Sequence, residues 1–316
     1  MSSSGPIVVL AGGTGGAKLA RGMLDVVGGE ELIVIANTGD DVEIYGAYVS
    51  PDPDLVTFWL ADRIDSRGWG LDDDTFAVMD GLRELDVDIW FNLGDRDLAI
   101  GIDRAHQLDE GVRLTDAQAA IARAFGVRAT VLPMSDMPVR TRVLAGERWW
   151  PLQEFMIKLR GEGPVRDVDF RHVRAAPPTT EVMEALATAR AILIGPSNPV
   201  ISIGPILALT GVREAISASP APVVAVSPLV RGQAVKGPTE AFMRWSDWSL
   251  DSDGVAAAYA GLIDGLVADE RTDALPVLET DVLMDTAEAR RRLADEALQF
   301  ALALSSCQPA DRPTSL

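Results

Sequence analysis

The feature that most constrains the fold of this chain is a series of six short, largely apolar runs, four of which contain no polar residue. Each run ends in glycine, proline, serine, asparagine or aspartate, and the runs lie at residues 6–11, 32–36, 87–93, 127–132, 191–194 and 223–226. A strand with one face in water alternates apolar and polar side chains, whereas an uninterrupted apolar strand is buried on both faces. The series therefore predicts an α/β fold, in which helices cover both faces of a mostly parallel sheet.

The first apolar run leads into a glycine-rich loop, Gly12-Gly13-Thr14-Gly15-Gly16, and then into residues 17–24, where apolar side chains recur at helical spacing. Such a loop places backbone N–H groups at the positive end of a helix dipole, where they bind phosphate. Two common patterns fail, because Ala17-Lys18-Leu19 replaces the Gly-Lys-Ser/Thr of a Walker loop and Lys18 replaces the third glycine of G-x-G-x-x-G. We interpret the loop as a phosphate-binding site, with a plain tight turn as the alternative.

Polar residues that follow the other apolar runs are further candidates, since ligands of open α/β sheets bind beyond the carboxyl ends of the strands. The segment Ser197-Asn198-Pro199 follows one run and offers hydroxyl and amide donors to a phosphate or a base. Lys18 and Lys236 can each meet a diphosphate as a point charge. The alternatives are a plain turn at residues 195–199 and a solvated loop lysine at position 236.

Four acidic clusters are candidates for binding a cation or a hydroxyl group, at residues 40–41, 52–54, 72–74 and 95–97. Asp95-Arg96-Asp97 follows an apolar run, and Asp52 and Asp54 lie in a loop that proline stiffens. We favour these two clusters as oxygen ligands for Mg²⁺ or for a sugar-like hydroxyl. The cluster at 72–74 is typical of a helix N-terminus instead.

Composition excludes several classes of partner and site. Lys and Arg number 28 against 47 Asp and Glu, for a net charge of −19, so neither nucleic acid nor an acidic membrane is expected to bind. A single cysteine, Cys307, rules out an intrachain disulfide and a thiolate metal cage, and two histidines rule out a three-histidine zinc site. Any metal is therefore expected to be a hard cation held by carboxylates and phosphate oxygens.

The organisation of the chain follows from the same patterns. The start lacks the basic region of a signal peptide and no apolar stretch is long enough to span a membrane, so the cytoplasm is expected. Residues 1–304 are expected to form one α/β domain, in which residues 140–178, with their weaker pattern, form a smaller subdomain or lid. Residues 305–316, rich in serine and proline, are expected to be a disordered tail.

Eight segments, taken in order, resemble the 2-phospho-L-lactate transferase (CofD/FbiA) family of coenzyme F-420 biosynthesis. The resemblance extends from residue 7 to about residue 240. The matching segments are AGGTGGAKLARGM at 11–23, ANTGDD at 36–41, SPDPDLVTFWL at 50–60, RGWGLDDDTF at 67–76, NLGDRDLA at 92–99, LPMSDMPVRT at 132–141, IGPSNPVISIGPIL at 194–207 and VAVSPLVRGQAVKGPT at 224–239.

The resemblance implies a Rossmann-like fold and a homodimer. It also implies that a phospho-hydroxyacid group moves from a guanylyl-activated donor to the ribityl hydroxyl of Fo, the 8-hydroxy-5-deazaflavin chromophore. GMP would leave and Mg²⁺ would assist.

The resemblance further implies roles for individual residues. Contacts with Fo map onto Asp54 and Asn92, and onto Ser50 and Pro51 beside Asp54. The guanosine diphosphate moiety would be held by the residues Gly12, Gly13, Thr14, Gly15, Gly16, Lys18, Ser197, Asn198, Pro199 and Lys236. Our hypothesis is that Asp54 orients the attacking hydroxyl or binds Mg²⁺, that Asp40, Asp95 or Asp97 completes the cation site, and that Asp95 and Arg96 join Asp54 in catalysis.

Two questions stay open at the level of sequence. Relatives commonly read Ser-Asp-Asp where this chain has Ser135-Asp136-Met137, so the donor acid could be phospholactate, phosphoenolpyruvate or phosphoglycerate. A sugar-nucleotide-binding regulator of related fold is the alternative function. An NAD-dependent oxidoreductase is disfavoured, because Asn37 stands where an acidic residue usually binds the ribose.

Overall fold

The computed structural model describes residues 5–234 and 237–307, and its centre is a seven-stranded sheet in which every neighbouring pair is parallel. The α/β fold expected from the apolar runs is thereby confirmed. In spatial order the strands are β14 (Val277–Glu279), β13 (Gly265–Ala268), β10 (Val223–Val226), β9 (Ala191–Ile194), β1 (Ile7–Ala11), β2 (Leu32–Ala36) and β5 (Thr130–Pro133).

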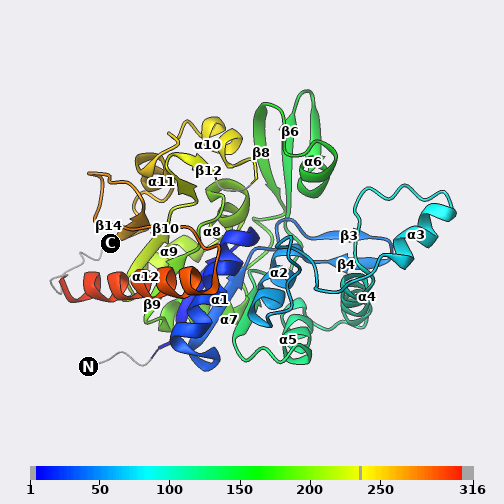
Figure 1. Cartoon of the computed structure of the whole chain (residues 1–316), viewed down its shortest axis with the longest axis horizontal. Helices are drawn as coiled ribbons and strands as arrows, with labels where there is room; N and C mark the ends of the chain where they lie inside the picture. Colours follow the sequence, from blue (N-terminus) through cyan, green and yellow to red (C-terminus); the bar gives the residue numbers. More distant parts are fainter. Residues whose placement is uncertain (1–4, 235–236, 308–316) are drawn as a thin grey trace.

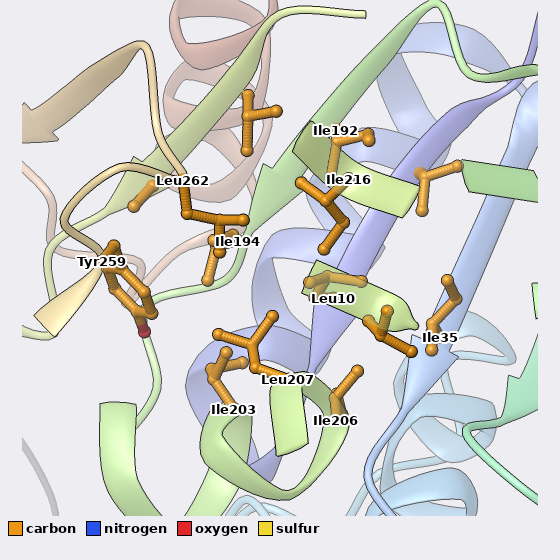
Figure 2. Packing of buried hydrophobic residues seen from close by; sticks show 14 of the residues in the cluster. Leu10, Ile35, Ile192, Ile194, Ile203, Ile206, Leu207, Ile216, Tyr259 and Leu262 are labelled. Atoms are coloured by element: carbon orange, nitrogen blue, oxygen red, sulfur yellow. The ribbon is translucent and has the colours of Figure 1, made fainter. Parts of the chain in front are cut away.

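Helices cover both faces of this sheet, because the side chains of each strand point alternately to two apolar clusters. In β1, Ile7 and Val9 belong to one cluster and Val8 and Leu10 to the other. The first cluster is completed by α1 (Gly13–Val27), α2 (Pro51–Leu60) and α12 (Ala287–Cys307), and α1 and α12 lie side by side in Figure 1. The second is completed by α7 (Thr180–Thr188), α8 (Gly204–Ala208), α9 (Val212–Ala218) and α11 (Ser252–Ala258), and Figure 2 shows its centre.

The order of the strands creates a switch point between β1 and β9. From β1 the chain passes to β2 and β5 at one edge, and it then returns to β9 and continues through β10 and β13 to β14 at the other edge. The loops that follow β1 and β9 therefore lead in opposite directions, and a crevice at the carboxyl edge between two such strands is the usual ligand site of open α/β sheets.

One expected strand is wrong. Residues 87–93 form no strand, and they lie between α3 (Ala77–Glu84) and α4 (Asp95–Asp109). Ile89, Phe91 and Leu93 instead face a small separate cluster that is shared with β3 (Val42–Ile44) and β4 (Ala47–Val49). An apolar run indicates burial, and here the burial is against a local hairpin and two helices rather than within the main sheet. The other five expected strands are present, and β13 and β14 were not expected.

Residues 140–178 contain a second sheet, which projects from the main body in Figure 1. Its antiparallel strands, in spatial order, are β7 (Arg148–Pro151), β6 (Arg140–Ala145) and β8 (Val165–Arg171). The helix α6 (Leu152–Lys158) packs on this sheet, and both contribute to an apolar cluster that also contains Val200, Ile201 and Phe242. That this segment moves as a lid stays a prediction.

The remaining elements connect these layers. They are η1 (Gly29–Glu31), α5 (Leu114–Ala124), the π-helix η2 (Pro199–Ile203), β11 (Leu229–Val230), β12 (Gln233–Ala234) and α10 (Thr239–Trp245). The last helix, α12, continues to Cys307, so the expected tail begins later than residue 305. The rest of that expected tail, residues 308–316, lies outside the described residues.

Among the helices described, none is by itself long and apolar enough to cross a membrane. The segments Pro199–Ala208 and Val212–Ala218 meet the criteria of length and composition only when they are taken together, and they are bent by 84° relative to each other.

Candidate functional site

A cavity of about 530 Å³ lies at the carboxyl edge of the sheet, where the loops after β1 and β9 part. We call it the switch-point cavity. Loops after three neighbouring strands and the segment before α12 form most of its wall. The lining residues are Gly12, Gly13, Thr14, Gly15, Lys18, Trp69, Met156, Pro196, Ser197, Asn198, Ile201, Ser202, Ser227, Pro228, Val230, Gly237, Pro238, Thr239, Val282, Leu283, Met284 and Asp285.

The N-terminus of α1 faces this cavity. Its N-cap is Gly12, and the N–H groups of Thr14 and Gly15 lie in the first helical turn, where no intrahelical acceptor exists. The N–H of Gly16 donates to Ser197 Oγ at 3.0 Å, and that hydroxyl donates to the carbonyl oxygen of Gly12. The loops after β1 and β9 are thus tied together around a helix N-terminus, which is a favourable place for an anion.

Only Gly12 lies between β1 and α1, so the loop expected at residues 12–16 is mostly the first turn of the helix, and two of its glycines are required by packing. A Cβ atom on Gly15 would lie 1.9 Å from the carbonyl oxygen of Pro196, and one on Gly16 would lie 2.8 Å from the Cα of Ala11. Gly13 has a φ of +63°, which a side chain would strain. The glycines therefore permit the close approach of the α1 N-terminus to β1 and to the loop after β9.

Beside the glycine-rich loop lie two carboxylates, Asp40 and Asp52, which we call the carboxylate pair. The N–H of Gly13 donates to Asp52 Oδ1 at 2.5 Å. Asn37 Nδ2 lies between the pair, 2.9 Å from Asp52 Oδ2 and 3.4 Å from Asp40 Oδ1. Gln153 Nε2, from α6, donates to Asp40 Oδ2 at 2.9 Å.

Electrostatics make this pair a favourable place for a cation. Burial raises the pKa of Asp52 to about 6, although hydrogen bonds from Asn37 and Gly13 oppose the change. Burial also raises the pKa of Asp40, and the charges of Asp52 and Asp41 raise it further. A bound cation would offset both the burial and the mutual repulsion.

The four residues expected to contact Fo do not line the switch-point cavity. Both carboxylate oxygens of Asp54 accept hydrogen bonds from the buried guanidinium of Arg104. Ser50 is buried and donates to Asp41 Oδ1 at 2.8 Å, while Pro51 is the first residue of α2. Asn92 is exposed, and its Oδ1 accepts a hydrogen bond from Arg83 Nη2 at 2.5 Å. Their contact with Fo stays a prediction.

The segment Asp95-Arg96-Asp97 begins α4 and joins it to α3. Asp95 accepts hydrogen bonds from the hydroxyl of Thr75 and from the N–H groups of Ala77 and Val78 at the start of α3. In return, Asp74 accepts hydrogen bonds from the N–H groups of residues 96 and 97. Each helix is thus capped by a carboxylate of the other segment, which gives Asp95 a structural role in this arrangement. Arg96 has an exposed side chain.

Asp97 lies near Asp54 rather than near the carboxylate pair. Burial, and then the charges of Asp54 and Asp74, raise the pKa of Asp97 to about 7 against the opposing charge of Arg104. In the structure, Asp40 lies beside Asp52, whereas Asp54 and Asp97 lie beside Arg104. Our hypothesis placed Asp54, Asp40 and Asp97 in one cation site, and the structure groups these carboxylates differently. Over residues 5–234 and 237–307, no three Asp, Glu, His or Cys side chains are arranged to hold a metal ion.

The raised pKa of Asp97 predicts a pH dependence of stability. In the unfolded chain this carboxyl loses its proton near pH 3.8, whereas the native state keeps it until about pH 7. Between these values the native state binds more protons, so the free energy of unfolding falls as the pH rises. Asp97→Asn removes this effect, so the free energy of unfolding of the variant should rise relative to that of the wild type by up to about 1.4 kcal/mol per pH unit across this range. Urea unfolding of both proteins across this range measures the difference, and a difference independent of pH would contradict the prediction.

The residues expected to hold a nucleotide lie mostly together. Seven of them line the switch-point cavity: Gly12, Gly13, Thr14, Gly15, Lys18, Ser197 and Asn198. Gly16 lies behind them on Ser197, and Pro199 begins η2. Lys18 Nζ lies 4.0 Å from Asp285 Oδ1, which also lines the cavity. Lys236 lies outside the described residues.

Several residues of the site were not singled out from the sequence. The sequence marks Asp52 and Asp54 as one cluster, and the resemblance points to Asp54 for the individual roles, although Asp52 is the one that contacts the N-terminus of α1. Arg104 and Gln153 carry no motif, and neither do residues 282–285 of the cavity wall. The contact of Arg104 with Asp54 spans 50 positions and that of Gln153 with Asp40 spans 113, so no local pattern indicates either.

Comparisons with a family model and with known proteins find similarity along almost the whole chain. The family model described as 2-phospho-L-lactate transferase CofD matches residues 7–297. The chain is 38% identical to the 2-phospho-L-lactate transferase of Methanosarcina mazei, covering 93% of this chain and 99% of that protein. It is 36% identical to the 2-phospho-L-lactate transferase of Methanocaldococcus jannaschii, with 93% and 97% covered. It is 38% identical to a phosphoenolpyruvate transferase of Kitasatospora aureofaciens, with 91% and 97% covered.

Solved structures share the fold at low sequence identity. A UPF0052-family protein from Bacillus halodurans matches with a TM-score of 0.53 and 18% identity, covering 85% of this chain and 82% of that chain. A second Bacillus halodurans structure matches with a TM-score of 0.55 and 17% identity, with 95% and 99% covered. At this level of identity the similarity concerns the fold alone.

Proposed function

Because this chain belongs to the 2-phospho-L-lactate transferase CofD family and is a transferase, we propose that it moves a phospho-hydroxyacid group from a guanylyl-activated donor to the ribityl hydroxyl of the deazaflavin Fo. GMP is the leaving product, and the reaction belongs to coenzyme F-420 biosynthesis. The observation that carries this proposal is the switch-point cavity, into which a helix N-terminus points beside a pair of carboxylates.

The cavity suits the guanosine diphosphate part of the donor. Its volume of about 530 Å³ is in the range of small-molecule sites. The N–H groups of Thr14 and Gly15 would bind phosphate oxygens, and Lys18 would add a positive charge. The apolar walls from Pro228, Val230 and similar side chains would hold the base and exclude water.

The carboxylate pair fits Mg²⁺. This ion is usually bound through one or two carboxylates together with substrate phosphates, and the raised pKa values of Asp40 and Asp52 reflect repulsion and burial that a cation would relieve. We therefore assign Asp40 and Asp52, rather than Asp54, as the residues that would hold it. When bound, Mg²⁺ would neutralise charge on the phosphate oxygens.

The protein itself contributes to the reaction by holding the reacting groups in position. Displacement at phosphorus needs an attacking oxygen in line with the leaving group and stabilisation of the oxygens around phosphorus. The first turn of α1 supplies fixed N–H groups for that charge, and the bond between Gly16 and Ser197 holds this turn against the loop after β9. Asp54, Asn92, Ser50 and Pro51 remain the proposed contacts for Fo.

The identity of the donor acid follows from a direct assay. The purified protein is incubated with Fo, Mg²⁺ and one guanylyl-activated acid at a time, carrying phospholactate, phosphoenolpyruvate or phosphoglycerate. We expect mass spectrometry to detect GMP and an Fo adduct with one of them, and neither product when Fo is omitted. No product from any donor, together with thermal stabilisation by a UDP-sugar, would support the sugar-nucleotide-binding regulator instead.

The segment that departs from the family pattern does not predict the donor. Ser135, Asp136 and Met137 do not line the cavity, and Asp136 is held by Arg113 and by Thr115 at the start of α5. Relatives named for phospholactate and for phosphoenolpyruvate are similarly close to this chain. The assay therefore decides between these acids.

A further inference from the structure

Helix α6 joins the small antiparallel sheet to the carboxylate pair. Met156 of this helix lines the switch-point cavity. One turn earlier, Gln153 donates from Nε2 to Asp40 Oδ2 at 2.9 Å. Residues three apart lie on one face of a helix, so one face of α6 contacts both the cavity and the pair.

The position of α6 is set by its own packing. Leu152 and Phe155 are buried in the apolar cluster that α6 shares with the small sheet and with Phe242. The ring of Phe155 packs edge to face on the ring of Phe242, with their centroids 6.0 Å apart. Lys158 Nζ lies 4.6 Å from the centroid of the Trp90 ring. These contacts hold α6 from two sides, so the amide of Gln153 is presented to Asp40 by a fixed element.

Asp40 depends on this contact for its orientation. It follows β2, and its carboxylate also has a hydrogen bond from its own backbone N–H and a long one, 3.4 Å from Oδ1 to Asn37 Nδ2, so Gln153 provides the only short contact from a distant element among the described residues. Asp52 repels it, and this repulsion favours a conformation in which the two carboxylates point apart. The hydrogen bond from Gln153 opposes this movement and stabilises the ionised carboxylate.

We propose that Gln153 is a positioning residue, which holds Asp40 in the orientation that lets Asp40 and Asp52 bind one divalent cation. The proposal rests on the assignment of these two carboxylates under the proposed function. The small sheet that presents α6 thereby takes part in cation binding without supplying a ligand. Amide and carboxyl groups that orient a metal ligand commonly change metal affinity by tenfold or more when they are removed.

The test measures cation binding directly. Mn²⁺ is titrated into the full chain, with and without GDP, and the free ion is followed by electron paramagnetic resonance. The binding that Asp40→Asn weakens defines the site. Gln153→Met keeps the size of the side chain and removes the donor, and we expect it to weaken this binding about tenfold.

Gln107→Met is the matched control. Gln107 Nε2 donates to Asp103 Oδ2 at 2.6 Å on the surface of α4, so the same donor and acceptor are separated there from the site. This variant should bind Mn²⁺ like the wild type. In the Asp40→Asn background, Gln153→Met should have no further effect, because the group that it positions is gone.

Three results would overturn the proposal: wild-type affinity in Gln153→Met, an equal loss in the Asp40→Asn background, or no Mn²⁺ binding that depends on Asp40. If Gln153→Met unfolds, Gln153→Asn decides: it keeps the amide on a side chain one methylene shorter, which no longer reaches Asp40 Oδ2, so Mn²⁺ binding should weaken, and an unchanged affinity counts against the proposal. The titration contains neither Fo nor an activated donor. A failed transfer assay beside the expected Mn²⁺ results would thus contradict the proposed function alone.

Discussion

Replacing Arg104 with methionine is expected to lower the free energy of unfolding by roughly 3–5 kcal/mol. Arg104 is fully buried, and its guanidinium donates to both oxygens of Asp54, to the carbonyl oxygen of Tyr48 at 3.0 Å and to Gln118 Oε1 at 3.3 Å. Methionine fills much of the same space but leaves the Asp54 carboxylate buried without its counter-charge. An unpaired buried charge costs far more than the intact pair contributes.

Urea unfolding of the wild type and the variant measures this loss. The double variant Arg104→Met/Asp54→Asn should recover part of it, because the buried negative charge is then absent as well. Arg271→Ala is the control, since it breaks an exposed ion pair with Glu279 and should leave the unfolding midpoint unchanged. An Arg104→Met protein that unfolds at the wild-type urea concentration would show that the pair is not needed for stability.

Gly15→Ala is expected to reduce the transfer rate at limiting donor by about a hundredfold or more. The new Cβ would lie 1.9 Å from the carbonyl oxygen of Pro196, and a backbone atom cannot rotate away as a side chain can. The first turn of α1 must therefore move from the loop after β9, and the N–H groups that face the cavity move with it. A displacement of about 1 Å is enough for a loss of this size.

Calorimetric titration with GDP and the transfer assay test this expectation together. Gly81→Ala is the control, because a Cβ at Gly81 meets no atom within 4 Å and the residue lies inside α3. Alanine there should leave GDP binding unchanged and stabilise the helix slightly. If Gly15→Ala binds GDP as tightly as the wild type does, the close approach of the two loops is not what shapes the site.

Local patterns predicted the main sheet well. Burial on both faces of a parallel strand demands an uninterrupted apolar run, and this requirement acts on each strand separately, so β1, β2, β5, β9 and β10 could be found from sequence. The glycine-rich loop could be found for a similar reason, since a strand, a tight loop and a helix follow one another within 20 residues. The strand expected at 87–93 is wrong, because apolar side chains indicate that a segment is buried but not which element buries it.

The site itself depends on contacts that local patterns do not contain. Asp52 and Asp54 both lie in the first turn of α2, yet one carboxylate meets the N–H of Gly13 and the other meets Arg104, because they point to different sides of the helix. Which of them faces the glycine-rich loop depends on how α2 packs against α1. The contact of Gln153 with Asp40 likewise depends on where the small sheet places α6. Sequence reasoning found the right segments and could not choose between neighbouring side chains.

Two parts of the wall of the switch-point cavity come from segments that lie far apart in the chain. One part is the loop after β1, and the other is the segment 282–285 that leads into α12, the helix that covers α1. Synthesis on the ribosome releases the N-terminal end first. A ligand can therefore stabilise the finished protein by mass action, but it finds no complete pocket on the nascent chain while β1 and α1 are emerging.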